Sequence, residues 1–407
     1  MRLLVVLSLV AAAAIPASTQ TRQRGRELGI PFPGQTGPLN AITDVPGIAV
    51  GHVTLIEGEG RLVPGKGPIR TGVTAILPRP RGNWDPVFAA TFNLNGNGDM
   101  TGINWIKESG FMEGPILLTG THSVGTVRDA AIQWQAKNGR EFVFTYPIVA
   151  ETFDGLNDAN GEHVKAIHAS QALDRARPGV VEEGAIGGGT GMVCNGFKGG
   201  IGTSSRELKP PDGKTYTLGV LVQCNYGGDL RILGVPIRPE ITDLGQCTVL
   251  SQPLSRPWTR GTPECPKTGG AEGPYVAAND DGGRGSIIVI VATDFPLLPH
   301  QLERLTKRVG MGLGRLGSWA GNGSGDLFLA FSTANAGAAN PAGPVSLSMW
   351  PNDMMNPIFQ ATIDATEEAV VNAMLAAQTM TGADGIRVFG LPGDRVMAAL
   401  RKYGRVK

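Results

Sequence analysis

The chain has 407 residues, of which 41% are hydrophobic and 17% are charged, and its formal net charge is +1. A chain of this length and composition buries a sizeable core in one large domain or two ordinary ones, which excludes a disordered polypeptide. The charges are balanced and no basic run occurs, which argues against nucleic acid as a partner. Glycine is abundant, with 59 residues and no fixed period, and this indicates many tight turns rather than collagen.

The N-terminal segment has the pattern of an export signal. A positive charge at Arg2 precedes the apolar run 3–14, and small residues up to Ala17 offer cleavage points. We predict a signal peptide over residues 1–17 and a mature protein that is periplasmic or secreted. The alternative is a membrane anchor, but the run is short for a membrane span. We therefore expect no membrane association.

Hydrophobic patterning predicts alternating groups of strands and helices. Apolar runs bounded by turn residues predict strands over 48–55, 73–77, 87–92, 115–119, 141–150, 216–226, 287–292 and 327–332. Helical patterns cover 100–107, 124–137, 160–176, 299–316, 358–380 and 394–401. Pairs of strands followed by pairs of helices indicate a layered α/β fold with sheets inside and helices outside.

The four cysteines contain no Cys-x-x-Cys pair, so a zinc site is poorly supported. Cys247 and Cys265 flank a segment rich in proline, serine, threonine and glycine, and an oxidising compartment permits a disulfide between them. The sequence leaves open whether that bond forms. Cys194 and Cys224 lie in apolar, strand-like surroundings, and we expect them to be buried thiols.

The segment 248–285 is the clearest break in composition and indicates a linker inside the chain, of a length that is usually functional or disordered. It ends at a polar, glycine-rich loop that leads to Ser286 and the apolar run 287–292, which predicts a strand buried on both faces. Ser286 is either an ordinary turn serine or a nucleophile. In the second case the chain cuts itself between Gly285 and Ser286, and the new α-amine serves as the base.

Other residues suit a serine mechanism that lacks histidine. No His-Glu-x-x-His or Gly-x-Ser-x-Gly motif occurs, so neither a histidine zinc site nor an α/β-hydrolase triad is supported. Ser324 and Asp326 are expected at a turn before a strand, where they can hydrogen-bond to a hydroxyl or an ammonium. Asn225 is expected at the end of another strand, and its amide donors suit an oxyanion. Each of the three is also common as a turn former.

Several ordered motifs then match one family across essentially the whole mature chain. The chain resembles the autoprocessing aminopeptidases of the DmpA/BapA type, which include L-aminopeptidase D-amidase/D-esterases and β-peptidyl aminopeptidases. The matching motifs are ITDVPGIAVGH at 42–52, YPIVAETFDG at 146–155, GGGTGM at 187–192, VQCNYGG at 222–228, GSIIVIVATDFPLLP at 285–299 and GSGD at 323–326.

The resemblance implies a single-domain α/β fold, a four-layer αββα sandwich of the N-terminal-nucleophile-like (DmpA) type. It implies an inactive precursor that is cut at Gly285–Ser286. The α chain (18–285) and the β chain (286–407) would stay associated, and the protein would form a homo-oligomer, often a tetramer. It implies no metal and no cofactor.

The resemblance also assigns roles to catalytic residues. Ser286 matches the N-terminal nucleophile, and Ser324 and Asp326 match the serine and the acidic residue that follow it in the family at this spacing. Asn225 matches the asparagine of the oxyanion hole.

Two further residues match the substrate-binding part of the family's site. Glu151 matches the glutamate that pairs with the free amine of the substrate. Tyr146, expected on the same strand, is a candidate for shaping or polarising the site.

The expected function is that of a secreted, autoproteolytic serine aminopeptidase that releases N-terminal β-amino acids or small L-amino acids from peptides, amides or esters. The alternatives are an amino-acid acyltransferase of similar self-cleaving fold and a non-catalytic periplasmic binding protein. The sequence does not decide between β-, D- and L-amino acids.

Overall fold

The computed structural model describes residues 23–140, 144–251, 254, 259, 261–267 and 285–407. The predicted signal peptide and most of the second half of the predicted linker lie outside the described residues. No helix in the described ranges is long and apolar enough to cross a membrane.

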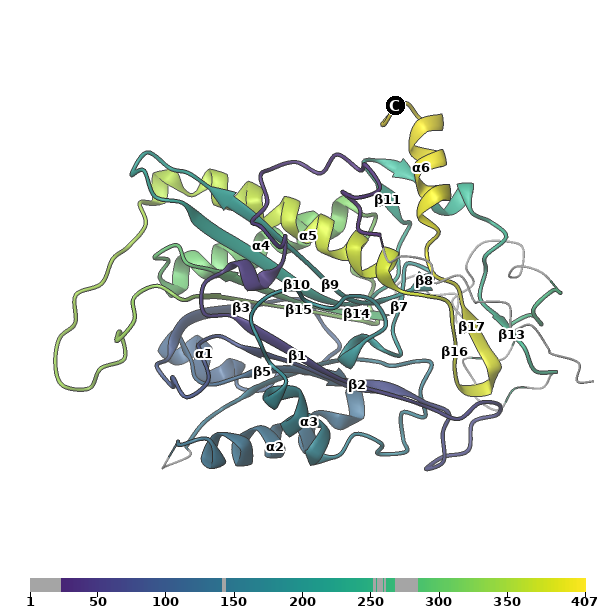
Figure 1. Ribbon diagram of the computed structural model, residues 1–407, viewed down its shortest axis with the longest axis horizontal. Coiled ribbons are helices and arrows are strands. Elements are labelled where there is room, and N and C mark those ends of the chain that lie inside the picture. Colours follow the sequence, from purple (N-terminus) through teal and green to yellow (C-terminus); the bar gives the residue numbers. More distant parts are fainter. Residues whose placement is uncertain (1–22, 141–143, 252–253, 255–258, 260, 268–284) are drawn as a thin grey trace, which may run out of the picture.

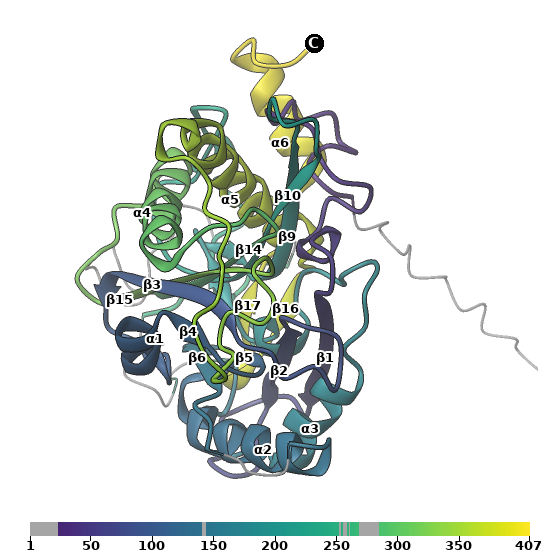
Figure 2. The ribbon, with the colours of Figure 1, turned by 90° about the vertical axis from the view of Figure 1, so that its left-hand side faces the viewer.

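Two β-sheets pack face to face and are covered by helices on both outer sides (Figures 1 and 2). The first sheet has the strand order β1-β2-β5-β6 and the second has the order β4-β3-β15-β14-β10-β9. Helices α2 and α3 cover the first sheet, and helices α4 and α5 cover the second. The predicted four-layer αββα sandwich is therefore confirmed.

The strands of the two large sheets are β1 (Ala49–Glu57), β2 (Ile69–Leu77), β3 (Val87–Gly96), β4 (Phe111–Met112), β5 (Ile116–Gly120), β6 (Ile148–Thr152), β9 (Gly200–Leu208), β10 (Tyr216–Asn225), β14 (Gly285–Thr293) and β15 (Ser324–Ser332). The helices are α1 (Ile103–Ser109), α2 (Val124–Lys137), α3 (Ala166–Asp174), α4 (Pro299–Arg315), α5 (Asn356–Ala376) and α6 (Gly393–Lys402). The short strands are β7 (Val193–Cys194), β8 (Phe197–Lys198), β11 (Arg231–Ile232), β12 (Val235–Pro236), β13 (Cys247–Thr248), β16 (Met380–Thr381) and β17 (Ile386–Val388).

Strand β14 is buried on both faces, as predicted. Ile287 and Val289 belong to the apolar core under α4 and α5. Ile288 and Ile290 belong to the core between the two sheets. All four side chains are fully buried, and burial of each stabilises the fold by about 1.5–3 kcal/mol.

Several predicted elements have different bounds in the structure, and two of them begin well after the predicted residue. The helix predicted over 160–176 begins only at Ala166, because Glu162 has a left-handed φ of 50° that a helix does not accept. The strand predicted over 141–150 is β6, which begins at Ile148. Pro147 precedes it, and a proline cannot donate a ladder hydrogen bond. Residues 141–143 of that prediction lie outside the described residues.

Both pairs of cysteines form disulfides. Cys247 and Cys265, whose bond the sequence left open, are joined with their Cα atoms 4.9 Å apart. The expectation of buried thiols at Cys194 and Cys224 is wrong, since these two are joined as well, with Cα atoms 5.7 Å apart. Strand β7 packs against β10, and that contact between segments brings together two cysteines that local sequence patterns do not connect.

The close approach of α5 to β9 yields a first prediction. A Cβ at Gly202 would lie 2.0 Å from the carbonyl oxygen of Ala369 and 2.6 Å from the backbone nitrogen of Ala373. We expect Gly202→Ala to lower the free energy of unfolding by about 1–3 kcal/mol, because the helix must move away from the sheet. Urea unfolding followed by circular dichroism measures the change.

Gly125, near the start of α2, provides the matched control. A Cβ there meets no atom within 4 Å, so Gly125→Ala should raise the free energy of unfolding by about 0.4–1 kcal/mol. Equal effects of the two substitutions would contradict the close packing of α5 on β9.

Candidate active site

Ser286 lies near the start of the central strand β14, between two neighbouring strands. It is opposite Asn225 of the antiparallel strand β10 and beside Gly325 of the parallel strand β15. Its exposed fraction is 5%. The ladder on both sides holds the backbone of Ser286 in place, so the hydroxyl is carried by a rigid element.

Gly285 packs directly against the backbone of the strand end that follows β10. Its φ is 147°, and a Cβ would lie 2.4 Å from the Asn225 carbonyl oxygen and 2.5 Å from the Tyr226 Cα. Both observations require glycine at this position. In the intact chain the Ser286 hydroxyl donates to the Gly285 carbonyl oxygen at 2.6 Å. The hydroxyl is thus next to the peptide bond that precedes it.

Ser324 and Asp326 lie within β15 rather than at a turn before a strand, which corrects the prediction. The strand begins at Ser324 because its parallel pairing with β14 extends to Gly285. The Ser324 hydroxyl donates to Oδ1 of Asp326 at 2.8 Å. Burial raises the pKa of Asp326 to about 6, and the Ser324 hydrogen bond opposes this shift. Oδ2 of Asp326 is buried and has no hydrogen-bond partner within the described ranges.

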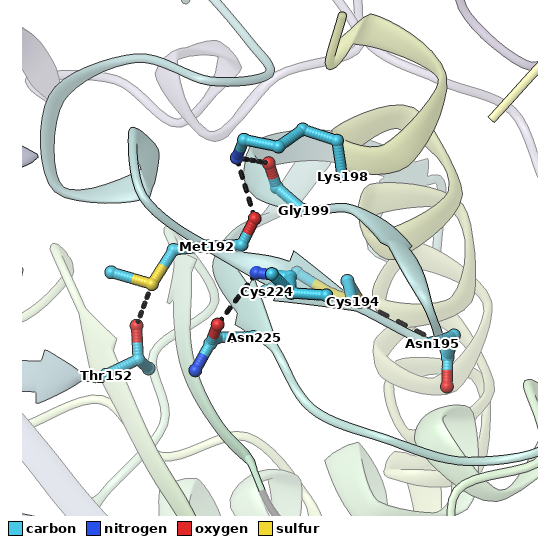
Figure 3. Close-up of a disulfide and its surroundings, with 9 residues drawn as sticks. Thr152, Met192, Cys194, Asn195, Lys198, Gly199, Cys224 and Asn225 are labelled. Carbon is cyan, nitrogen blue, oxygen red and sulfur yellow. Dashed lines mark hydrogen bonds between the residues drawn. A yellow bond between two sulfur atoms is a disulfide. The ribbon is translucent and has the colours of Figure 1, made fainter. Parts of the chain in front are cut away.

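Asn225 is the last residue of β10, as predicted. Its side-chain Oδ1 accepts from the backbone N–H of Val193 at 2.8 Å. A backbone N–H can only donate, so this bond fixes which side of the amide carries the oxygen. The Nδ2 group, with its two donors, points away from the Val193 contact (Figure 3). Asn225 therefore presents an oriented donor at the end of β10, opposite Ser286.

Glu151 lies within β6, one residue beyond the predicted strand 141–150 and one residue before the end of β6. Its exposed fraction is 3%. One carboxylate oxygen accepts from the backbone N–H of Asp99 at 3.0 Å, and the other accepts from the Thr121 hydroxyl. Burial raises the pKa of Glu151, and these two hydrogen bonds oppose the rise because they stabilise the carboxylate.

A short loop joins Glu151 to the neighbourhood of Ser286. A Cβ at Gly325, the residue paired with Ser286, would lie 2.3 Å from the Asn97 carbonyl oxygen. A Cβ at Gly98 would lie 3.2 Å from Oε1 of Glu151 and 3.4 Å from the Gly325 Cα. The loop at 97–99 therefore passes over the start of β15 and contacts the Glu151 carboxylate. This places Glu151 and Ser286 in one region of the molecule.

Tyr146 precedes β6, so the expectation that it shares a strand with Glu151 is wrong. Its ring packs 6.5 Å from that of Trp105, centroid to centroid. Both rings line a cavity of about 720 Å³, whose other lining residues include Asp99, Met100, Thr101 and Glu108. Because Asp99 also donates its backbone N–H to Glu151, the cavity adjoins the region of the buried carboxylate.

Two features of this site had no signal in the sequence. Val193 orients Asn225 through its backbone, and Lys198, a fully buried lysine, lies close by (Figure 3). Neither belongs to a motif that sequence reasoning associates with catalysis. Among the described residues, no group of three or more His, Cys, Asp or Glu side chains could hold a metal ion.

Comparison with solved structures defines the class of protein. The L-aminopeptidase D-Ala-esterase/amidase of Ochrobactrum anthropi, described as a variant of the Ntn hydrolase fold, matches with a TM-score of 0.81 and 41% identity, over 94% of this chain and 99% of that chain. A beta-aminopeptidase from Burkholderia sp. matches with a TM-score of 0.78 and 42% identity, over 94% of this chain and 99% of that one. The protein is thus a hydrolase with the Ntn hydrolase fold.

Sequence comparison gives the family. The model of peptidase family S58 matches residues 40–388. The beta-peptidyl aminopeptidase BapA of Sphingosinicella microcystinivorans is 48% identical over 394 residues, which cover 96% of this chain and 95% of that protein. The chain belongs to peptidase family S58 and is similar to the DmpA/BapA-type aminopeptidases, as its motifs predicted.

The buried carboxyl group of Asp326 leads to a prediction of how stability depends on pH. Its pKa is raised in the folded chain, so the folded state binds more protons than the unfolded state between the two pKa values. Stability therefore falls as pH rises through about 4 to about 6. We expect Asp326→Asn to raise the free energy of unfolding by about 1–3 kcal/mol at about pH 8, and the gain to vanish at about pH 4.

Urea unfolding at the two pH values, with Ser286→Ala present in every chain so that self-cleavage cannot alter the site, measures this difference. Asp353→Asn, at an exposed position, is the control for the loss of a surface carboxylate. A gain from Asp326→Asn that is the same at both pH values would contradict the assignment.

Proposed function

We propose that this protein is a serine aminopeptidase, made as a precursor and activated by self-cleavage between Gly285 and Ser286. The observation that carries the proposal is the position of Ser286. Its hydroxyl contacts the Gly285 carbonyl group, and Asn225 of β10 lies opposite it. The 97–99 loop links Glu151 to Gly325, which is beside Ser286.

Self-cleavage uses groups that are already adjacent in the intact chain. Oγ of Ser286 attacks the carbonyl carbon of Gly285, and the hydroxyl proton passes to the amide nitrogen as the C–N bond breaks. The resulting ester between Gly285 and Ser286 is hydrolysed by water. This releases the carboxylate of Gly285 and leaves Ser286 with a free α-amine beside its own hydroxyl.

The mature site then acts on the N-terminal residue of a substrate. Glu151 binds the substrate ammonium, and a charge-assisted hydrogen bond between them stabilises the buried carboxylate. Oγ of Ser286 attacks the first carbonyl carbon, and the Ser286 α-amine takes the proton, since the pKa of a free α-amine is ordinarily about 8. Nδ2 of Asn225 donates to the oxyanion. The leaving amine takes that proton from the Ser286 ammonium as the C–N bond breaks, and water then hydrolyses the acyl-enzyme.

The hydrogen-bonded pair of Ser324 and Asp326 supports the nucleophile from the neighbouring strand. In the register of the two strands, Asp326 pairs with Ile287, the residue after Ser286, and its Oδ2 is a buried acceptor. Once Ser286 has a free α-amine, that acceptor can balance the charge of the ammonium form.

The substrates that we propose are peptides, amides or esters with an N-terminal β-amino acid or small L-amino acid. The relatives named as beta-peptidyl aminopeptidase and L-aminopeptidase D-Ala-esterase/amidase support this class. The cavity beside Tyr146 and Trp105 is the place where such a substrate would enter.

We also propose export, continued association of the two chains and a homo-oligomer, with a tetramer as the expected form. The N-terminal pattern and the two disulfides suit the periplasm or the medium. Strand β14 of the β chain pairs with β10 of the α chain, and α5 packs on β9, so the cut chains share one sheet and one core.

Ser286→Ala tests self-cleavage. On a denaturing gel and by intact mass, the wild-type protein should give two fragments, of which the smaller begins at Ser286 and has 407 − 285 = 122 residues. The alanine variant should remain a single chain, because it lacks the attacking oxygen. Ser286→Cys, which keeps a nucleophile, is the control and should still be cut. A wild-type chain that stays whole would refute the mechanism.

Glu151→Gln tests the ammonium site. Loss of a charge-assisted hydrogen bond of about 1.5–3 kcal/mol should raise KM for β-alanine p-nitroanilide or L-alanine p-nitroanilide by about 10- to 100-fold. Glu303→Gln on the surface of α4 should leave KM unchanged. An N-acetylated substrate, which has no ammonium, should not be cleaved. Equal cleavage of free and acetylated substrates would argue for a different peptidase activity.

A further inference from the structure

Lys198 is a buried lysine whose ammonium is bound by backbone carbonyl groups. Its side chain is 0% exposed. Nζ donates to the carbonyl oxygens of Met192 at 2.7 Å, Gly199 at 2.8 Å and Gly189 at 3.4 Å. The three donors of the ammonium thus have three acceptors. Burial lowers the pKa of Lys198 to about 7, while the carbonyl contacts oppose that shift because they stabilise the charged form.

One peptide group joins Lys198 to Asn225. The carbonyl oxygen of Met192 accepts from Lys198, and the N–H of the same peptide bond belongs to Val193, which donates to Oδ1 of Asn225 at 2.8 Å. Figure 3 shows the ammonium, the peptide and the asparagine amide in sequence. The Asn225 amide in turn carries Nδ2 at its far end. The result is a continuous chain of hydrogen bonds from a buried cation to the oxyanion donor.

This chain has a directional electrostatic effect. A cation at the Met192 carbonyl oxygen withdraws electron density from the peptide, so the Val193 N–H becomes a stronger donor to Oδ1 of Asn225. A stronger bond at Oδ1 withdraws density from the asparagine amide and makes the Nδ2 protons more positive. Burial preserves the effect, since no water is available to screen it.

The same contacts also hold the peptide in position. Lys198 ties together carbonyls on both sides of β7, and the Cys194–Cys224 disulfide joins the residue after Val193 to the residue before Asn225. The Val193 N–H and the Asn225 amide therefore have little freedom to move apart.

We propose that Lys198 is a positioning residue for catalysis, which orients and polarises the Asn225 amide through the Met192–Val193 peptide. This inference rests on the proposed function, in which Nδ2 of Asn225 donates to the oxyanion. A lysine that only anchors the loop would change stability, and its effect on kcat would be independent of Asn225.

A double-mutant cycle separates the two roles. We would purify the full chain as wild type, Lys198→Met, Asn225→Ala and the double variant, allow cleavage to finish, and measure kcat and KM on β-alanine p-nitroanilide. Asn225→Ala should lower kcat by about 10²- to 10³-fold. Lys198→Met, which keeps the length but removes the charge, should lower kcat by about 10-fold and leave KM within about twofold.

The double variant should have the kcat of Asn225→Ala alone, because Lys198 acts through that side chain. Lys198→Arg, which keeps the cation, should recover most of the lost activity. Lys214→Met, at an exposed lysine, should change neither kcat nor stability.

Two further outcomes are distinguishable, because one refutes the role of Lys198 and the other refutes the proposed function. An active Lys198→Met enzyme with unchanged kcat, or losses that multiply in the double variant, would refute the role of Lys198 and leave the proposed function intact. A wild-type protein without aminopeptidase activity would refute the proposed function itself. If Lys198→Met does not fold, the same cycle with Lys198→Gln decides, because removal of the charge should lower kcat only where Asn225 is present.

Discussion

The pairing of β14 with a strand on each side is the constraint on which the site depends. Its side chains fill the core under the helices and the core between the sheets, so the strand cannot shift without exposing both. Ser286 is the second residue of that strand, so its backbone is held in the same fixed position. The ladder then sets Asn225 opposite the serine and Gly325 beside it. Ser286 and Asn225 thus occupy fixed relative positions before any substrate is present.

The polar groups of the site are costly to bury, and the structure compensates for that cost only in part. Glu151 and Asp326 each accept hydrogen bonds that stabilise their charged forms, yet burial still raises the pKa of both carboxyl groups. Lys198 has carbonyl acceptors for all three of its donors. Such groups interact strongly in a low local dielectric because their interactions are screened little. The same property suits the proposed function, in which the site binds an ammonium and stabilises an oxyanion.

Local patterns predicted the elements that depend on local periodicity. Helices α2 and α4 have nearly the predicted bounds, and Leu302, Leu305 and Val309 of α4 face the core. The prediction was wrong where contacts between segments decide the outcome. Ser324 and Asp326 lie in a strand because β15 pairs with β14 as far as Gly285, and nothing in the residues 323–326 reveals that pairing. The catalytic roles assigned to the site residues by resemblance stay predictions.

The sequence by itself determined the strands and helices with a strong hydrophobic period, the family resemblance and the residue types available for catalysis. These depend on neighbours along the chain, whose spacing is visible in the printed letters. Only the tertiary structure brought the 97–99 loop between Glu151 and Gly325, joined Cys194 to Cys224, and set Lys198 behind the peptide that orients Asn225. Those contacts arise from the packing of the two sheets and their connecting loops, and a one-dimensional pattern does not encode which distant backbone atoms will meet.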